Sequence, residues 1–592
     1  MRNRSEIDAS MKWDLTPIYP DAAAMETDLA DCGAMAEKIA ACAGTLSTKE
    51  GLAAALGLTF GAMEKLERAS CYAYLNYSLD GGNTAAQEMM AKTQNAGITL
   101  MTAMSFMEPE MLTVPEEELK AWLDDPALAT YRHYVLDVIR AKAHTLDAKG
   151  EAILSQVAKI TGTASDTYDM FTDVEMEIPK IENENGEMVE LTSGNFGMYR
   201  ESSCRKVREN AFNTMFGTYK KYNNTFATLY AGNVKKDNML AAIRRYDSAC
   251  EAALFAGNVP VSVYDSLVGG VHEALPVMQK YLELRKKVLN LPELDVFDLY
   301  CPMTADVEYP MPFASGKELV KKALAPLGEE YAALLDRAFS ENWIDVYETP
   351  GKASGAYSMG IYGAHPYVLL NYTDTLDDAF TLAHELGHSM HSHYSNTTQD
   401  YVNHDYKIMV AEVASTVNEV LLTKYLLATE TDLARRAYVL NHFLEGFRTT
   451  VFRQTLFAEF ERKAHELESA GTPLTADCLN GIYAELEKTY YSAAKMQDVV
   501  AVEWSYIPHF YRAFYVYQYA TGFSAAVAIA SHILETGDTA GYLRFLTTGG
   551  SDYPLNELKI AGIDLTSPTV VENAMQVFAE TIDELAAVLV KE

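Results

Sequence analysis

Two histidines and a glutamate stand close together in the segment HELGH, residues 384–388. On a helix, His384 and His388 lie one turn apart on the same face, so both imidazoles can reach one ion. Zn²⁺ accepts neutral imidazole nitrogens at about 2.0–2.1 Å in tetrahedral sites. Glu385 would lie beside the ion and could accept a proton from a water that the ion activates. The spacing therefore predicts a zinc site that performs hydrolysis.

The residues around this motif argue against a surface helix that merely carries two histidines. Most of them are apolar or small: Phe380, Leu382, Ala383, Leu386, Gly387 and Met390. Such a helix is expected to be buried on all sides, and buried ionisable groups need partners. A bound metal ion would supply that partner.

A third protein ligand must come from elsewhere in the chain. His391 shares the face of His384 but lies about 10.5 Å further along the helix axis, so one ion cannot easily bind both. We expect His391 to lie in the core or beside the site. The pattern HExxHxxGxxH is excluded, because the sequence has His391 and Tyr394 where that pattern needs glycine and histidine.

Downstream carboxylates are the remaining candidates: Asp400, Asp405, Glu412 and Glu419. The two aspartates lie in a polar loop, where a solvated side chain is expected. Glu412 lies in the apolar segment IMVAEVASTVNEVLLTKYLL, in which a carboxylate is costly unless it is ligated or paired. Small neighbours would let this segment pack closely on the HELGH helix: Ala411, Ala414 and Ser415. We therefore predict Glu412 as the third ligand, with a buried salt bridge as the alternative.

Three protein ligands leave one position for water, which is typical of a catalytic site. Glu419 lies two turns after Glu412 and could accept the second N–H of a ligating histidine. Amide hydrolysis also needs donors for an oxyanion. The chain has 37 tyrosines, and five candidate donors lie close together in IPHFYRAFYVYQYATGFSAA: His509, Tyr511, Tyr515, Tyr517 and Tyr519. The alternative is an aromatic core stripe.

The elements that position these residues are expected to be mainly helical. Apolar residues at three- and four-residue spacing dominate from about residue 22 to 160 and again after Asp374. Asn185-Gly186 predicts a β-hairpin within residues 174–192. Residues 343–372 predict a small sheet next to the HELGH helix, with YVLLNY as a strand whose edge could accept an extended peptide. We expect an N-terminal helical lobe at 1–195 and a catalytic domain at 196–592.

Composition excludes several classes of protein. The 592 residues carry 48 basic and 82 acidic side chains, a net charge of −34, without a basic cluster. Nucleic acid and anionic membranes are therefore not expected as partners. The first residues, MRNRSEIDASMKWDL, lack an apolar signal region, and the seven scattered cysteines form no CxxC pair, so we expect a cytoplasmic protein. The uncharged stretch 513–534 contains polar side chains, which predicts buried core instead of a membrane span.

The sequence resembles the M3 family of zinc oligopeptidases, the thimet oligopeptidase and neurolysin relatives, and it is most similar to the oligoendopeptidase F branch. HELGH followed by Glu412 carries the resemblance, together with segments at both ends and through the centre of the chain: MKWDLTPIYP, SGAYSMGIYGAHPYVLLNYTDTLDDAFTLAHELGHSMHS, HFYRAFYVYQYATG and SDYPLNELKIAGIDL. These segments cover essentially the whole chain.

The resemblance implies a large two-lobed, neurolysin-like helical fold around a deep channel. It implies one Zn²⁺ per chain, held by His384, His388 and Glu412, with Glu385 as general base. It also implies that a histidine and a tyrosine stabilise the oxyanion. His509 and Tyr519 match these roles, although a small gap in spacing leaves Tyr515 and Tyr517 open.

We therefore predict a zinc endopeptidase that hydrolyses internal bonds of short peptides and needs no obligate protein partner. A zinc carboxypeptidase is one alternative, and it would require a cation for the terminal carboxylate of its substrate. A non-catalytic peptide-binding protein on the same scaffold is another, against which the complete set of site residues argues.

Overall fold

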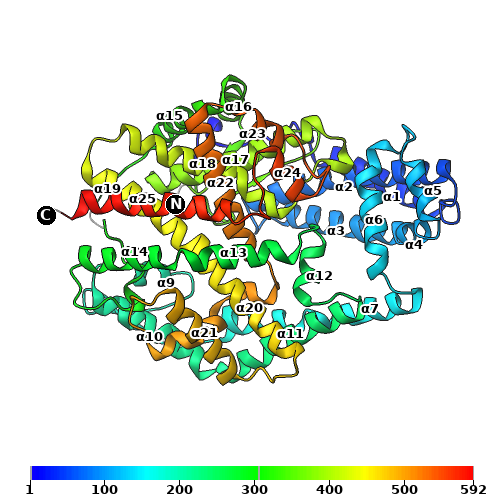
Figure 1. The fold of residues 1–592 in the computed structure, drawn as a ribbon. Helices are drawn as coiled ribbons and strands as arrows, with labels where there is room; N and C mark the ends of the chain where they lie inside the picture. The colour runs from blue at the N-terminus through cyan, green and yellow to red at the C-terminus, as the bar shows by residue number, and fades with distance from the viewer. Residues whose placement is uncertain (1–2, 305–306, 308, 591–592) are drawn as a thin grey trace. The chain divides into compact units, whose positions relative to one another are not determined.

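The computed structural model describes residues 3–304, 307 and 309–590, and these residues are mostly helical (Figure 1). They form two compact units, each assembled from three separate segments of the chain. The first unit comprises the described parts of 1–143, 309–425 and 529–563, and the second those of 144–308, 426–528 and 564–592. The mainly helical fold predicted from the sequence is confirmed, as are the hairpin and the small sheet.

The first unit is built from an N-terminal helical layer and a central group of helices around a small sheet. Its helices are α1 (Ala22–Ala40), α2 (Lys49–Leu79), α3 (Thr84–Met104), α4 (Met107–Met111), α5 (Glu116–Trp122), α6 (Arg132–Ala141), α15 (Phe313–Ala323), α16 (Glu329–Ser340), α17 (Leu376–Thr398), α23 (Ala540–Leu546) and α24 (Pro554–Ile560). Leucines and methionines of α2 to α5 form one buried core, including Leu52, Leu56 and Met111.

The second unit is helical apart from the hairpin. Its helices are α7 (Ala148–Thr161), α8 (Thr163–Met170), α9 (Phe196–Arg200), α10 (Arg205–Lys221), α11 (Asn223–Ile243), α12 (Ala249–Phe255), α13 (Val261–Glu273), α14 (Leu275–Val288), α19 (Leu433–Gly446), α20 (Arg453–Ser469), α21 (Ala476–Tyr490) and α25 (Thr569–Leu589). Strands β1 (Ile181–Glu182) and β2 (Met188–Val189) pair antiparallel across the predicted turn. Helices α18 (Ile408–Thr429) and α22 (Tyr517–Thr536) each contribute to both units.

The sheet of the first unit precedes α17 and has the order β3-β5-β4. β5 (Tyr367–Leu369) pairs in parallel with β3 (Ile344–Asp345) and antiparallel with β4 (Tyr357–Met359). YVLLNY therefore supplies the central strand, and the expectation that its edge accepts a peptide is wrong. Both of its edges are already paired, which leaves β4 as an outer strand.

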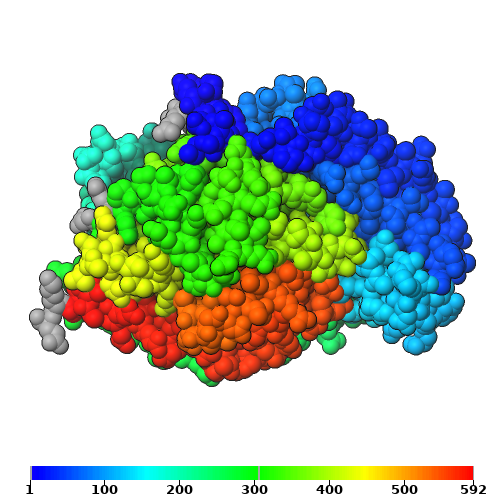
Figure 2. Space-filling view, turned by 90° about the horizontal axis from the view of Figure 1, so that it is seen from above, coloured from blue at the N-terminus to red at the C-terminus, as the bar shows by residue number. Residues whose placement is uncertain are grey.

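The start of the chain packs on this sheet. Met11 and Asp14 form backbone hydrogen bonds with Val346 and Asn342, and the Trp13 ring lies edge-on to Tyr367 at 6.1 Å. Figure 2 shows the blue N-terminal segment against the green segment that contains the sheet. The N-terminal segment therefore supports the sheet that precedes α17. Among the described residues, no helix is long and apolar enough to cross a membrane.

Candidate metal centre

Helix α17 carries the HELGH motif and begins at a strong N-terminal cap. Thr375 accepts a hydrogen bond from the Asp378 amide, and the Asp378 carboxylate accepts one from the Thr375 amide, which together form a capping box. The predicted burial is present, because most residues between Leu376 and Ser395 are buried. The helix is thus fixed both at its start and along its sides, so its histidines have little freedom to move.

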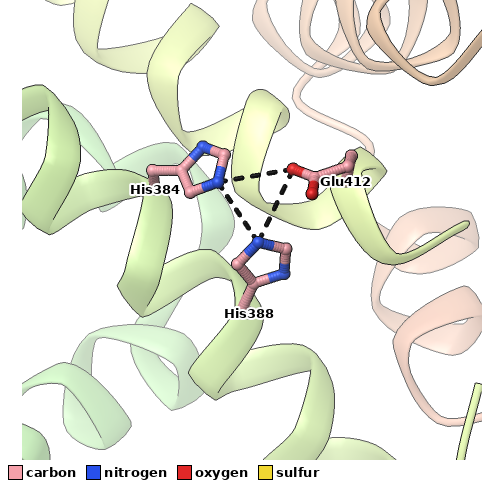
Figure 3. A group of neighbouring side chains, drawn as sticks. All are labelled: His384, His388 and Glu412. Carbon is pink, nitrogen blue, oxygen red and sulfur yellow. Dashed lines mark hydrogen bonds and ion pairs between the residues drawn. The ribbon is translucent and has the colours of Figure 1, made fainter. Parts of the chain in front are cut away.

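Three side chains converge in the first unit: His384, His388 and Glu412 (Figure 3). The two Nε2 atoms are 3.2 Å apart. Glu412 Oε2 lies 3.3 Å from Nε2 of His384 and 3.6 Å from Nε2 of His388. Ligands at about 2.0–2.1 Å from a tetrahedral ion are roughly 3.3–3.4 Å from one another. The donor atoms therefore already have the spacing that a tetrahedral metal site requires.

Helix α18 brings Glu412 to this point because the two helices approach each other very closely. A Cβ added to Gly387 would lie 2.5 Å from Ser415 Cα and 2.7 Å from Ala414 O. Asn418 Nδ2 donates to the Ala383 carbonyl at 2.9 Å and further fixes the pair of helices. The small residues of both helices thus determine the position of the carboxylate.

The charge distribution favours a cation at this centre. His384 Nδ1 lies 2.5 Å from Glu419 Oε1. Burial lowers the pKa of His384, but Glu412 and Glu419 outweigh it and raise that pKa well above its ordinary value. Burial raises the pKa of Glu412, and the two histidines reverse this and lower it strongly. The carboxylates therefore create a negative field that fits a divalent metal ion.

Glu385 lies next to the three converging side chains without being one of them. Its residue is 6% exposed, and burial raises the pKa of its carboxyl above the ordinary value. Within the described part of the chain, no hydrogen bond is seen for its carboxylate oxygens. A carboxylate with a raised pKa and free oxygens is suited to accept a proton from a water molecule.

The structure separates the remaining candidates from the site. His391 is fully buried and stacks on Tyr406 at 3.7 Å, and burial lowers the pKa of its imidazole to about 3. Asp400 accepts a hydrogen bond from Thr130, and Asp405 is exposed. As predicted, none of the three belongs to the converging group, and Glu419 contacts a histidine of that group.

In the second unit, the tyrosine-rich segment splits into two sets. His509 lies 6.3 Å from the Tyr515 ring and 6.2 Å from the Tyr519 ring, and the two phenolic oxygens are 3.4 Å apart. Tyr517 is 3% exposed and packs on Tyr264 at 5.3 Å instead. His509, Tyr515 and Tyr519 thus form one cluster, and Tyr517 is a core residue.

Two residues that position this cluster were missed in the sequence. Phe514, next to Tyr515, has a left-handed backbone with φ of 56°, which is unfavourable for a bulky residue. The carboxylate of Glu461, fully buried on α20, accepts a hydrogen bond from the Phe514 amide at 2.7 Å. Helix α20 carries many charged residues, so unlike Glu412 the buried Glu461 does not stand out in the sequence.

The helical fold, the His-His-Glu group and the adjacent glutamate together define a metal-dependent hydrolase of the HExxH class. Comparisons with known proteins narrow this class. The family model of peptidase family M3 matches residues 198–577, and the model described as oligopeptidase F matches residues 110–178.

Whole-chain relatives agree with these models. Oligopeptidase PepF of Bacillus subtilis is 41% identical over 100% of this chain and 89% of its own length. An oligoendopeptidase F homolog of Lactococcus lactis is 38% identical over 100% of this chain and 99% of its own length. The crystal structure of oligoendopeptidase-F from Enterococcus faecium matches with a TM-score of 0.76 and 36% identity, covering 96% of this chain and 99% of that one.

The chain belongs to peptidase family M3. It is a metalloendopeptidase of the oligopeptidase F type, and its substrates are peptides.

Proposed function

We propose that the metal is zinc, bound once per chain by Nε2 of His384, Nε2 of His388 and the Glu412 carboxylate. The observation that carries this proposal is the mutual spacing of the three donor atoms, 3.2 to 3.6 Å. Two imidazoles and one carboxylate in tetrahedral spacing are a preferred donor set of catalytic zinc. When bound, zinc supplies a Lewis acid that polarises the scissile carbonyl and lowers the pKa of a water.

Glu385 is the general base of the proposed reaction. Its raised pKa makes the carboxylate a better proton acceptor, and its free oxygens can reach a water beside the histidines. It takes a proton from the attacking water and then returns this proton to the nitrogen of the leaving amine. Glu419 holds the Nδ1 proton of His384, so that Nε2 keeps its lone pair for the metal.

His509 and Tyr519 are proposed as donors to the oxyanion, with Tyr515 as a neighbour of both. Burial lowers the pKa of His509, so its imidazole is neutral near pH 7 and donates from one ring nitrogen only. The short strand β4 is the proposed site for pairing with an extended substrate. Its Ser358 hydroxyl lies 2.8 Å from that of Ser389 on α17, which brings this outer strand next to the catalytic helix.

The proposal also covers the domain division and the cellular location of the protein. It divides the sequence into an N-terminal lobe at 1–195 and a catalytic domain at 196–592. This division along the sequence differs from the two compact units, the first of which combines 1–143 with the segments of the metal centre. The seven cysteines are all unpaired, which agrees with a reducing cytoplasmic location.

Metal analysis and product mapping test this function together. Purified protein should contain close to one zinc per chain by plasma mass spectrometry. A peptide blocked at both ends should be cut internally, because an endopeptidase needs no free terminus. Cleavage restricted to peptides with a free C-terminal carboxylate would show a carboxypeptidase instead. Absence of stoichiometric metal and of cleavage would show a peptide-binding protein.

A further inference from the structure

A small cavity in the second unit is lined by an unusual number of arginines. It has a volume of about 20 Å³, room for a single water-sized species. Three arginines and two glutamates are among the residues that line it: Arg200, Arg448, Arg453, Glu487 and Glu503. They come from the end of α9, the π-helical turn Phe447–Phe452, the start of α20, helix α21 and the 3₁₀ segment Asp498–Tyr506. Segments that are far apart in the sequence therefore place positively charged side chains around one small cavity.

Only two of the three arginines have an acidic partner. Arg448 binds the Glu445 carboxylate, with Nη2 at 2.6 Å, and Arg453 binds Glu503 at 2.5 Å. The Arg200 side chain forms neither a hydrogen bond nor an ion pair with any described residue. Its guanidinium lies over the Tyr300 ring at 3.4 Å, and Arg448 lies over the same ring at 4.2 Å. The cavity thus has an excess of positive charge.

Three buried polar atoms at the cavity have no hydrogen-bond partner among the described residues: Arg200 Nε, Tyr491 Oη and Glu487 Oε1. Tyr491 is 1% exposed and Glu487 is 2% exposed, so open solvent does not satisfy them. Leaving such groups without a hydrogen-bond partner destabilises the folded state. A species inside the cavity that accepts hydrogen bonds would remove this destabilisation.

The titration behaviour of the lining agrees with a positive potential. Burial alone would raise the pKa of Tyr300, but Arg453, Arg200 and Arg448 outweigh it and lower that pKa. Burial, together with the charge of Glu503, raises the pKa of Glu487, which favours its protonated form. A protonated Glu487, the Tyr491 hydroxyl and Arg200 Nε are all hydrogen-bond donors. A set of donors in a positive field favours an anion over water.

We infer that this cavity binds one monatomic anion, chloride under cellular conditions, which Arg200, Tyr491 and Glu487 hold by hydrogen bonds. Gluconate, a chain of six carbons, is far too large for this cavity and serves as the anion that does not bind. The bound chloride balances the charge of Arg200 and links α9, α21 and the residue that follows α21. Its effect is structural and independent of the metal centre, so it is measured by stability and by direct binding.

Thermal unfolding of the metal-loaded, full-length protein tests the inference. Sodium chloride is titrated against sodium gluconate at constant ionic strength and pH 7. Chloride should raise the unfolding midpoint in a saturable manner, because a ligand that binds only the folded state stabilises it. Gluconate should not. Crystals soaked in bromide should show an anomalous peak within the cavity.

Arg200→Gln should remove at least nine-tenths of the chloride-dependent shift. Arg244→Gln is the matched control, since Arg244 pairs with Glu151 in the same unit but outside the cavity. Tyr491→Phe, which removes one hydroxyl, should raise the chloride dissociation constant at least tenfold. This variant replaces Arg200→Gln as the test if Arg200→Gln does not fold. Equal midpoints in chloride and gluconate, or a cavity without bromide, would show that it holds only water. An unchanged chloride response in both variants would overturn the assignment of the ligands.

Discussion

His384 and Glu419 form a close pair, with 2.5 Å between Nδ1 and Oε1. The glutamate lies on α18, seven residues after Glu412. One helix therefore supplies both the Glu412 carboxylate of the metal centre and the Glu419 carboxylate that orients His384. Glu419 accepts a hydrogen bond from Nδ1–H of His384. This hydrogen bond fixes the imidazole in the tautomer whose Nε2 has a free lone pair.

Glu419→Gln should weaken metal binding roughly 10- to 100-fold, because a neutral amide is a poorer acceptor than a carboxylate. Competition with a zinc-binding dye at pH 7 measures this affinity. The control is Glu318→Gln, which changes an exposed glutamate of the same unit and should leave the affinity unchanged. Wild-type affinity in the Glu419 variant would show that the pair is not needed to orient His384.

Glu385→Gln should keep the metal and lose nearly all turnover. The amide has almost the same shape as the carboxylate but cannot accept the proton of the attacking water. General-base catalysis contributes about 10²–10⁴ in rate, so we expect kcat on a quenched fluorescent peptide to fall by at least 10². Metal content and circular dichroism should match the wild type. Turnover within a few-fold of wild type would remove Glu385 from the mechanism.

The two groups of tyrosines should respond differently to loss of the hydroxyl. Tyr519→Phe should lower kcat by about 10²–10³ with little change in KM, because an oxyanion donor acts mainly in the transition state. Tyr517→Phe, in the core beside Tyr264, should leave kcat within about twofold. Steady-state kinetics of both variants decide the assignment. A large loss of kcat in the Tyr517 variant alone would assign the oxyanion donor to Tyr517 instead of Tyr519.

Much of the metal centre could be predicted because the helix period is fixed. The spacing of His384 and His388 determines a shared face, and a carboxylate within an apolar helix indicates Glu412 without any knowledge of the fold. Burial of α17 likewise follows from its apolar neighbours. These features depend on local geometry and on the cost of burying charge, and the structure agrees with both.

Features that depend on long-range pairing could not be predicted. Strands of two or three residues are too short to show an alternation of apolar and polar residues that would distinguish a central strand from an edge strand. The segment YVLLNY therefore gave no indication that β5 lies between β3 and β4. The left-handed turn at Phe514 lies just before α22 begins at Tyr517, and it changes which tyrosines share a face. Its support, Glu461, lies 53 residues away in sequence.

Glu557 should make the first unit less stable as pH rises. It is fully buried on α24, both carboxylate oxygens lack a partner among the described residues, and burial raises its pKa to about 8. The folded protein therefore keeps a proton that the unfolded chain releases above its ordinary pKa of about 4.3. Stability is lost as pH rises from about 4.5 towards 8, since the unfolded state ionises first.

Glu557→Gln should remove this loss. Relative to wild type, its free energy of unfolding should increase between pH 4.5 and pH 8 by roughly 4 kcal/mol, because the folded state keeps about one proton more over some three pH units at about 1.36 kcal/mol each. Urea denaturation at the two pH values measures the difference. Glu535→Gln, at an exposed position, should show no such change. Parallel stability curves for wild type and the Glu557 variant would mean that this carboxyl is not protonated in the folded state.

Gly387 should be essential for the metal centre although it offers no side chain. A Cβ at this position would lie 2.5 Å from Ser415 Cα. The backbone of α18 cannot move aside as easily as the end of a flexible side chain. Gly387→Ala should push α18 away from α17 and displace Glu412, which lies one turn before Ser415. We expect metal affinity to fall at least tenfold and stability to fall by about 1–3 kcal/mol. Gly217→Ala is the matched control, because a Cβ there meets no atom within 4 Å and alanine favours the helix. If the Gly387 variant loses stability but keeps wild-type metal affinity, the spacing of the two helices does not determine the position of the third ligand.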